Sequence, residues 1–191
     1  MSAICTPVAV VTSAEDGVAH GTTVSAFASL SLSPPMVMIA LDLGSDLLAM
    51  IRRSRVFGVN VLGHRARKEA LAFAAKGSDK FAGVAWHWSA GVPRLDGGIA
   101  WLRCRVVEVL PGGDHQIVTG LVLESETVES AAPLVYHTRR FGTHSHFLSA
   151  AAPQHRAPAM ADEHGGSHSR YLPADPCQDP RRTSSQTRTG P

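Results

Sequence analysis

Long apolar runs and paired cysteines are both missing from this chain of 191 residues. No apolar stretch approaches the roughly 20 residues that cross a bilayer. The segment Met1 to Ile4 also lacks a basic leader, so we expect a cytoplasmic protein that does not span a membrane. Cys5, Cys104 and Cys177 are an odd number of cysteines without C-x-x-C spacing. This pattern argues against a disulfide framework and against a zinc cluster.

Charge is scarce too, because only 18% of the residues are Asp, Glu, Lys or Arg and the formal net charge is +2. The basic residues are scattered along the chain, which gives no electrostatic footprint for nucleic acid or for a membrane surface. The hydrophobic share of 44% and the length of the chain fit one globular domain with a substantial core.

Nucleotide-binding glycine motifs are absent as well. The chain contains neither G-x-G-x-x-G nor G-x-x-x-x-G-K-[ST], so it encodes no Rossmann pyrophosphate cradle and no P-loop. It has no nucleophile-elbow pattern and no carboxylate pair of the kind that glycosidases use. The sequence therefore does not predict a dedicated dinucleotide-binding domain.

What the chain does contain is a stretch dense in hydroxyl groups, residues 17–35, which ends on Pro34 and Pro35. Side chains two apart share one face of an extended chain. One face of this stretch would carry Thr23, Ser25, Phe27, Ser29, Ser31 and Ser33. That face is either a solvated edge of a sheet or, with backbone N–H groups, a site for an anionic planar ligand such as a flavin.

The remaining pattern is mostly that of strands. β-Branched and alternating apolar runs predict strands over 7–13, 36–43, 56–62, 99–110, 116–124 and 134–137. Two helices are expected, one over 45–53 and an alanine-rich one over 64–76 that packs through Leu71 and Phe73. A turn is expected over 93–98. The predicted fold class is therefore mainly β with peripheral helices.

Three positions have both an ordinary and a functional interpretation. Ser45 stands where a helix N-cap is expected, so its hydroxyl would cap the helix, and helix N-termini attract anions. Lys80 is by default one more solvated charge. The pair Asp114 and His115 follows two glycines and has the groups to donate a proton or stabilise developing charge. By spacing alone, an exposed histidine in a hairpin loop is the default interpretation of His115.

Several segments, taken in order, resemble one family. They are PVAVVTS, GTTVSAFASLSLSPPMVMIALDLGSDLLAMI, FGVNVL, SDKFAGVAW and GGDHQIVTGLV. This combination resembles the flavin reductase-like proteins with an FMN-binding split barrel, which are typically the reductase components of two-component monooxygenases. The resemblance runs from Cys5 to Gly142. It implies a split β-barrel with Greek-key-like connections and peripheral helices.

The resemblance also implies roles for single residues. His115 would lie near the nicotinamide or the flavin ring with Asp114 holding it, and these two are the expected catalytic residues. Lys80 would meet the flavin phosphate and Phe81 would cover the ring. Further flavin contacts are expected from Thr23, Ser25, Ala26, Phe27, Ser29, Ser31 and Ser45. No metal site is expected.

The expected function is NAD(P)H-dependent reduction of FMN or FAD, with NADH or NADPH as hydride donor. The reduced flavin would diffuse to a separate flavin-dependent monooxygenase. Because a second subunit would cover an open barrel face and members of the family generally pair, a homodimer is expected. Two alternatives keep the same barrel: a non-catalytic flavin-binding or storage protein, and an enzyme with fixed FMN that acts on a small substrate.

The C-terminal segment, residues 143–191, differs in composition from the rest. It holds half of the 12 prolines and half of the 10 histidines, and it shows neither a two-residue nor a 3.6-residue apolar period. We therefore predict a folded domain over residues 1–142 and a disordered tail over residues 143–191. The spacings of His144, His146, His155, His164 and His168 match no closed metal site.

Overall fold

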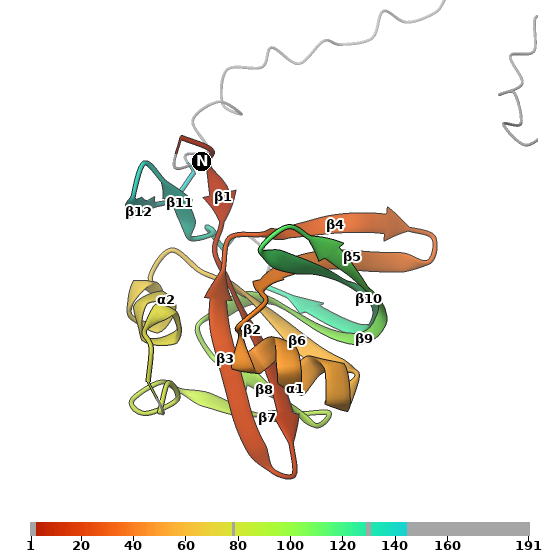
Figure 1. Ribbon diagram of the computed structural model, residues 1–191. Coiled ribbons are helices and arrows are strands. Elements are labelled where there is room, and N and C mark those ends of the chain that lie inside the picture. The colour runs from red at the N-terminus through yellow and green to blue at the C-terminus, as the bar shows by residue number, and fades with distance from the viewer. Residues whose placement is uncertain (1–2, 78, 129–130, 145–191) are drawn as a thin grey trace, which may run out of the picture. The chain divides into compact units, whose positions relative to one another are not determined.

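Strands dominate the computed structural model, which describes residues 3–77, 79–128 and 131–144 (Figure 1). The main sheet contains β2 (Ala9–Glu15), β3 (Val18–Val24), β4 (Phe27–Leu32), β5 (Pro35–Asp42), β6 (Val56–Leu62), β9 (Gly98–Gly112) and β10 (His115–Thr127). In space these strands follow the antiparallel order β3-β2-β6-β9-β10-β5-β4. The prediction of a mainly-β fold is confirmed.

Two smaller sheets flank the main one. β1 (Thr6–Pro7) pairs with β11 (Val135–His137), which pairs with β12 (Arg140–Gly142), and β7 (Trp86–Ser89) pairs with β8 (Val92–Leu95). Neither helix in the described part of the chain is long and apolar enough to cross a membrane. Most of the expected tail, residues 145–191, lies outside the described residues, and so do four of its five histidines.

The first helix, α1 (Asp46–Ser54), begins as the sequence predicts. The hydroxyl of Ser45 accepts a hydrogen bond from the backbone N–H of Leu48 at 3.4 Å, so its capping role is confirmed. Arg52 and Arg53 lie in the last turn, near the negative end of the helix dipole. Arg53 also forms an ion pair with Glu15 at 2.6 Å, which joins the helix to the end of β2.

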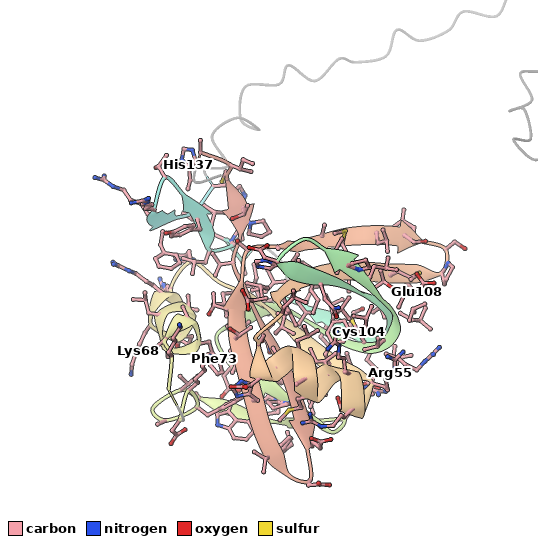
Figure 2. The ribbon with its side chains drawn as sticks, in the orientation of Figure 1. Arg55, Lys68, Phe73, Cys104, Glu108 and His137 are labelled. Carbon is pink, nitrogen blue, oxygen red and sulfur yellow. The ribbon has the colours of Figure 1, made fainter. Side chains whose placement is uncertain are left out.

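The second helix, α2 (Arg67–Ala74), is shorter than predicted and packs differently. Phe73 is fully buried and lies between α2 and β3, as Figure 2 shows, but Leu71 is 50% exposed. The expectation that Leu71 packs into the core is therefore wrong. Ala70 and Phe73, three residues apart, share the inward face of this helix, and Leu71 lies round to the side.

The core is divided by β2. Val11 belongs to a cluster of buried side chains that contains Leu47 of α1, whereas Val10 belongs to a second cluster that contains Phe73 of α2. Successive side chains of a strand point to opposite faces of its sheet. The two helices therefore lie on opposite faces of β2, and α1 also contacts β3 and β6 (Figure 1).

The hydroxyl-rich stretch does not form one extended face. It divides at Ser25 and Ala26 into β3 and β4, which lie at the two ends of the main sheet, and β4 has a bulge between Ser29 and Ser31. The prediction of a single face from Thr23 to Ser33 is therefore wrong. The physical reason is that β3 pairs back on β2 while β4 pairs forward on β5, so each half belongs to its own hairpin.

The prediction of a turn over 93–98 is partly wrong, because residues 93–95 belong to strand β8. The hydroxyl of Thr12 donates a 2.7 Å hydrogen bond to the carbonyl of Pro93, and the N–H of Leu95 donates to the buried side-chain oxygen of Asn60 at 2.8 Å. These bonds attach the two-stranded β7–β8 ribbon to β2 and β6. A proline is tolerated in an edge strand such as β8, because the N–H that proline lacks would face the open edge and would not take part in the hydrogen bonds between the strands.

Candidate functional site

A cavity of about 730 Å³, called here the main cavity, opens where the end of β3 meets the loop between β5 and α1. Its lining comes from residues 22–26, 40–42, 44–46 and 74–77, together with His20, Lys80 and His115. Segments that are distant in sequence therefore converge on one space. The volume lies within the range of about 300 to 1,000 Å³ that is typical of small-molecule sites.

One wall of the main cavity carries the hydroxyls of β3. Thr23 is held in place because its hydroxyl donates a 2.7 Å hydrogen bond to the carbonyl of Ala70 on α2. The carbonyl of Ala26 accepts a 3.0 Å bond from the N–H of Ala40 on β5, which fixes the chain just after β3. Ser25, between these two anchors, is exposed to the cavity. A donor on a fixed backbone is suited to orienting a polar ligand.

The N-terminal end of α1 forms a second part of the lining. Gly44 donates its N–H to the carboxylate of Asp42 at 2.7 Å, and Ser45 and Asp46 follow at the start of the helix. Backbone N–H groups at a helix N-terminus attract anions. This end of the cavity therefore combines helix N–H groups, which favour an anion, with the carboxylates of Asp42 and Asp46, which oppose one.

Lys80 supplies positive charge to the cavity, and His20 lines the cavity with it. The ammonium of Lys80 donates a 3.1 Å hydrogen bond to the carbonyl of Phe73. Burial lowers the pKa of Lys80, and Asp46 opposes this shift. Burial also lowers the pKa of His20, Lys80 lowers it further and Asp46 raises it. The sequence interpretation missed His20, because a lone histidine within a strand belongs to no recognisable motif.

Asp114 and His115 enter the site through a tight hairpin turn. Gly113 has a φ of +76°, a conformation that glycine adopts freely and that lets β9 turn directly into β10. His115 lies opposite Asp42 of β5, and the carbonyl of Asp114 accepts a 3.1 Å bond from the N–H of Leu43. The carboxylate of Asp114 lies 2.7 Å from Nδ1 of His115, and this hydrogen bond lowers the pKa of Asp114.

The structure brings some of the predicted site residues together and leaves others apart. Those that line the main cavity are Thr23, Ser25, Ala26, Ser45, Lys80 and His115. Those that do not line it are Phe27, Ser29, Ser31, Phe81 and Asp114. Phe81 packs edge-on against Phe73 at 4.8 Å between ring centroids, and Phe27 packs against the core. The catalytic roles assigned to Asp114 and His115 and the flavin contacts assigned to the other residues remain predictions.

Residues 1–145 match the family described as flavin reductase like domain. This chain belongs to the flavin reductase-like family. The match spans both helices and every described strand, so it includes the whole lining of the main cavity. The resemblance inferred from the sequence is confirmed, and with it the assignment to a family of oxidoreductases.

Named relatives agree with this assignment. The chain is 43% identical over 141 residues to the reductase component of 4-nitrophenol 4-monooxygenase/4-nitrocatechol 2-monooxygenase from Rhodococcus opacus, covering 74% of each chain. It is 37% identical over 148 residues to an NADH:riboflavin 5'-phosphate oxidoreductase from Streptomyces pristinaespiralis, covering 75% of this chain and 84% of that one.

Among solved structures, an NADH:FAD oxidoreductase from Streptomyces globisporus, in complex with NAD and FAD fragments, has the same fold. It superposes with a TM-score of 0.73 at 29% sequence identity and covers 75% of this chain and 88% of that chain. The predicted split-barrel class is therefore confirmed.

Proposed function

We propose that the protein is an NAD(P)H-dependent flavin reductase that transfers a hydride from a nicotinamide to FMN or FAD. The main cavity carries this proposal, because hydroxyls, a lysine and a helix N-terminus line it together with His115 in a chain of the flavin reductase-like family. The names of the relatives, which include an NADH:riboflavin 5'-phosphate oxidoreductase, support the same reaction.

The residues of the main cavity fit a flavin. Lys80 and the N-terminus of α1 provide positive charge and N–H donors for a phosphate. The hydroxyl of Ser25 is a donor for ring or ribityl oxygens, and Ala26 and Ala40 leave flat space for a planar ring. We therefore assign flavin binding to these elements.

When bound, the flavin supplies the acceptor for the hydride of the nicotinamide. The part of this chain is to bind and orient both molecules and to keep the flavin face open to a nicotinamide. His115 lines the cavity and is held by Asp114, so we assign it to orienting the nicotinamide. No protein base is required, because the hydride passes between the two cofactors.

The reduced flavin would then leave for a separate flavin-dependent monooxygenase. The proposal for this partner comes from relatives, such as the Rhodococcus opacus protein, whose names describe reductase components of monooxygenases. A flavin that must leave the enzyme needs an open site. The main cavity opens between surface segments of β3, α1 and α2, which is consistent with flavin as an exchanging substrate.

We also propose a homodimer formed through one end of the main sheet. Large apolar side chains are exposed on β4, β9 and β10, and Leu32 is 89% exposed. The others on these strands are Leu30, Val107, Leu110 and Leu123. β4, β5, β10 and β9 are consecutive neighbours at this end of the sheet (Figure 1). An apolar surface of this kind is typical of a contact between subunits.

Steady-state oxidation of NADH and of NADPH, measured at increasing concentrations of FMN and FAD, tests the proposed reaction. We expect turnover that rises with added free flavin to saturation. A protein that binds flavin without any turnover would instead be a storage module. Turnover that does not depend on added flavin, with flavin retained through purification, would indicate an enzyme with a fixed cofactor.

A further inference from the structure

His20 lines the main cavity, but the proposed function gives it no role. It belongs to β3, which lies at one edge of the main sheet, and its side chain is partly buried. Within the described part of the chain, neither ring nitrogen of His20 has a hydrogen-bond or ion-pair partner. A partly buried imidazole without a partner is available to bind a ligand, because polar atoms that leave water are normally paired.

The alternation of β3 directs His20 toward α1. His20 and Val24 lie four residues apart on one strand, so their side chains share a face. Val24 belongs to the buried cluster that contains Leu47 of α1, and β3 contacts this helix (Figure 1). The imidazole therefore lies on the face of β3 that α1 covers, and Asp46 is the first residue of that helix.

His20 lies in a cluster of charged groups at this end of the main cavity. The charged and titratable residues that line the cavity with it are Asp42, Asp46, Lys76, Lys80 and His115. Two of them act on His20 through space, because the ammonium of Lys80 disfavours the protonated imidazole and the carboxylate of Asp46 favours it. On β2, the neighbouring strand, the residue opposite His20 is the uncharged Ser13. An anion bound here would meet His20, Lys80 and the N–H groups at the start of α1 together.

The charge of His20 depends on what occupies the cavity. Without an anion, burial and then Lys80 lower the pKa of His20, and Asp46 only partly opposes them, so the imidazole is mostly neutral near neutral pH. A phosphate monoester carries about −1.5 to −2 charges near neutral pH and has three acceptor oxygens. Such a charge beside the imidazole favours its protonated form. Protonation also gives the ring a second N–H donor.

We propose that His20 is a phosphate-binding residue that takes up a proton from solvent when FMN binds. Together with Lys80 and the N–H groups at the start of α1, it holds the terminal phosphate. This inference rests on the proposed function, which places a flavin in the main cavity. No bond of FMN forms or breaks, because the proton moves only from water to the imidazole. The affinity for FMN therefore rises as the pH falls, whereas riboflavin, which lacks the phosphate, gains nothing from the proton.

Calorimetric titration of the full-length protein with FMN, in buffers that differ in ionisation enthalpy, counts the protons taken up. At about pH 7.5 we expect about half a proton or more for each FMN bound, and none with riboflavin. His20→Gln keeps a polar side chain but cannot be protonated, so it should bind FMN with little uptake. His115→Gln removes the other histidine that lines the main cavity and is the matched control, with uptake like that of the wild type. A wild-type protein without uptake, or undiminished uptake in His20→Gln, would overturn the proposal.

The pH dependence of binding is a second test that requires no variant. From about pH 8 to about pH 6.5, the affinity for FMN should rise about fivefold and the affinity for riboflavin should change less than about twofold. Quenching of flavin fluorescence measures both. An FMN affinity that stays constant or falls over this range would refute the inference, even in a protein that oxidises NAD(P)H. Proton-linked FMN binding without NAD(P)H oxidation would refute the proposed function alone, and a protein that binds no FMN would refute both.

Discussion

Nδ1 of His115 lies 2.7 Å from Oδ1 of Asp114, and the imidazole lines the main cavity while the carboxylate side chain is 89% exposed. A hydrogen bond this open to water adds little to the stability of a fold, because water competes for both of its partners. Its consequence is geometric. The carboxylate fixes which ring nitrogen faces outward and so holds the other nitrogen toward the cavity.

Replacing this histidine should affect the nicotinamide more than the flavin. We expect His115→Ala to lower kcat/KM for NAD(P)H about tenfold to a hundredfold, or about 1.4 to 2.7 kcal/mol, because orientation is lost while the hydride acceptor remains. Flavin affinity should change less. Asp114→Asn, which keeps a hydrogen-bond acceptor, is the matched variant and should lose less activity. A His115→Ala protein with full kcat/KM, or with impaired flavin binding instead, would contradict this role.

The hydroxyl contacts of the flavin can be assigned by comparing β3 with β4. Ser25→Ala should weaken FMN binding by about 1 to 3 kcal/mol, the range for a lost hydrogen bond to a charged or strongly polar group. Ser29→Ala/Ser31→Ala should change it less, because neither residue lines the main cavity. Quenching of flavin fluorescence gives both dissociation constants. An equal loss in the β4 variant would place the flavin against both strands, as the resemblance implied.

Sequence patterns predicted the fold well where the structure of a segment depends on its own residues and not on a distant partner. The N-cap at Ser45 required only spacing and residue type, and it is as expected. The prediction of one hydroxyl-bearing face was wrong because it assumed a single strand that continues through Ser25 and Ala26, whereas one strand ends before these residues and another begins after them. Which partner strand each half joins depends on long-range pairing, and a local pattern contains no information on that pairing.

The site was predictable only through residues with distinctive motifs. His115 follows a pair of glycines and was found, whereas His20 is a lone histidine in a strand and became visible only when Lys80 and Asp46 were placed beside it. The end of β3 and the end of α2 converge on the main cavity through tertiary packing, which no local pattern predicts.

The proposed dimer can be tested at its most exposed leucine. Leu32→Asp should convert the protein to a monomer, because an aspartate at an apolar contact between subunits must lose its water without gaining a partner. Sedimentation velocity measures the change. Val18→Asp is the control, since Val18 is 64% exposed on β3, away from β4, β9 and β10. Dimers that persist in Leu32→Asp, or a wild-type protein that is already monomeric, would exclude this interface.

Protonation of His20 should make the fold less stable at mildly acidic pH. Burial, and then Lys80, lowers the pKa of His20 below its ordinary value of 6.5, and Asp46 only partly opposes this. The unfolded chain therefore binds the proton more readily than the folded one. The free energy of unfolding should be unaffected above about pH 6.5 and should fall as the pH drops toward the folded-state pKa, below which the loss is complete.

Urea unfolding at a series of pH values between about 5 and 8, which spans the ordinary histidine pKa, measures this effect. His20→Gln cannot take up the proton, so its free energy of unfolding should decline less than that of the wild type over the acidic half of the series. His64→Gln, at an exposed position outside the main cavity, should follow the wild type. Parallel pH profiles for the wild type and His20→Gln would mean that burial and Lys80 do not penalise the charged imidazole in the folded protein.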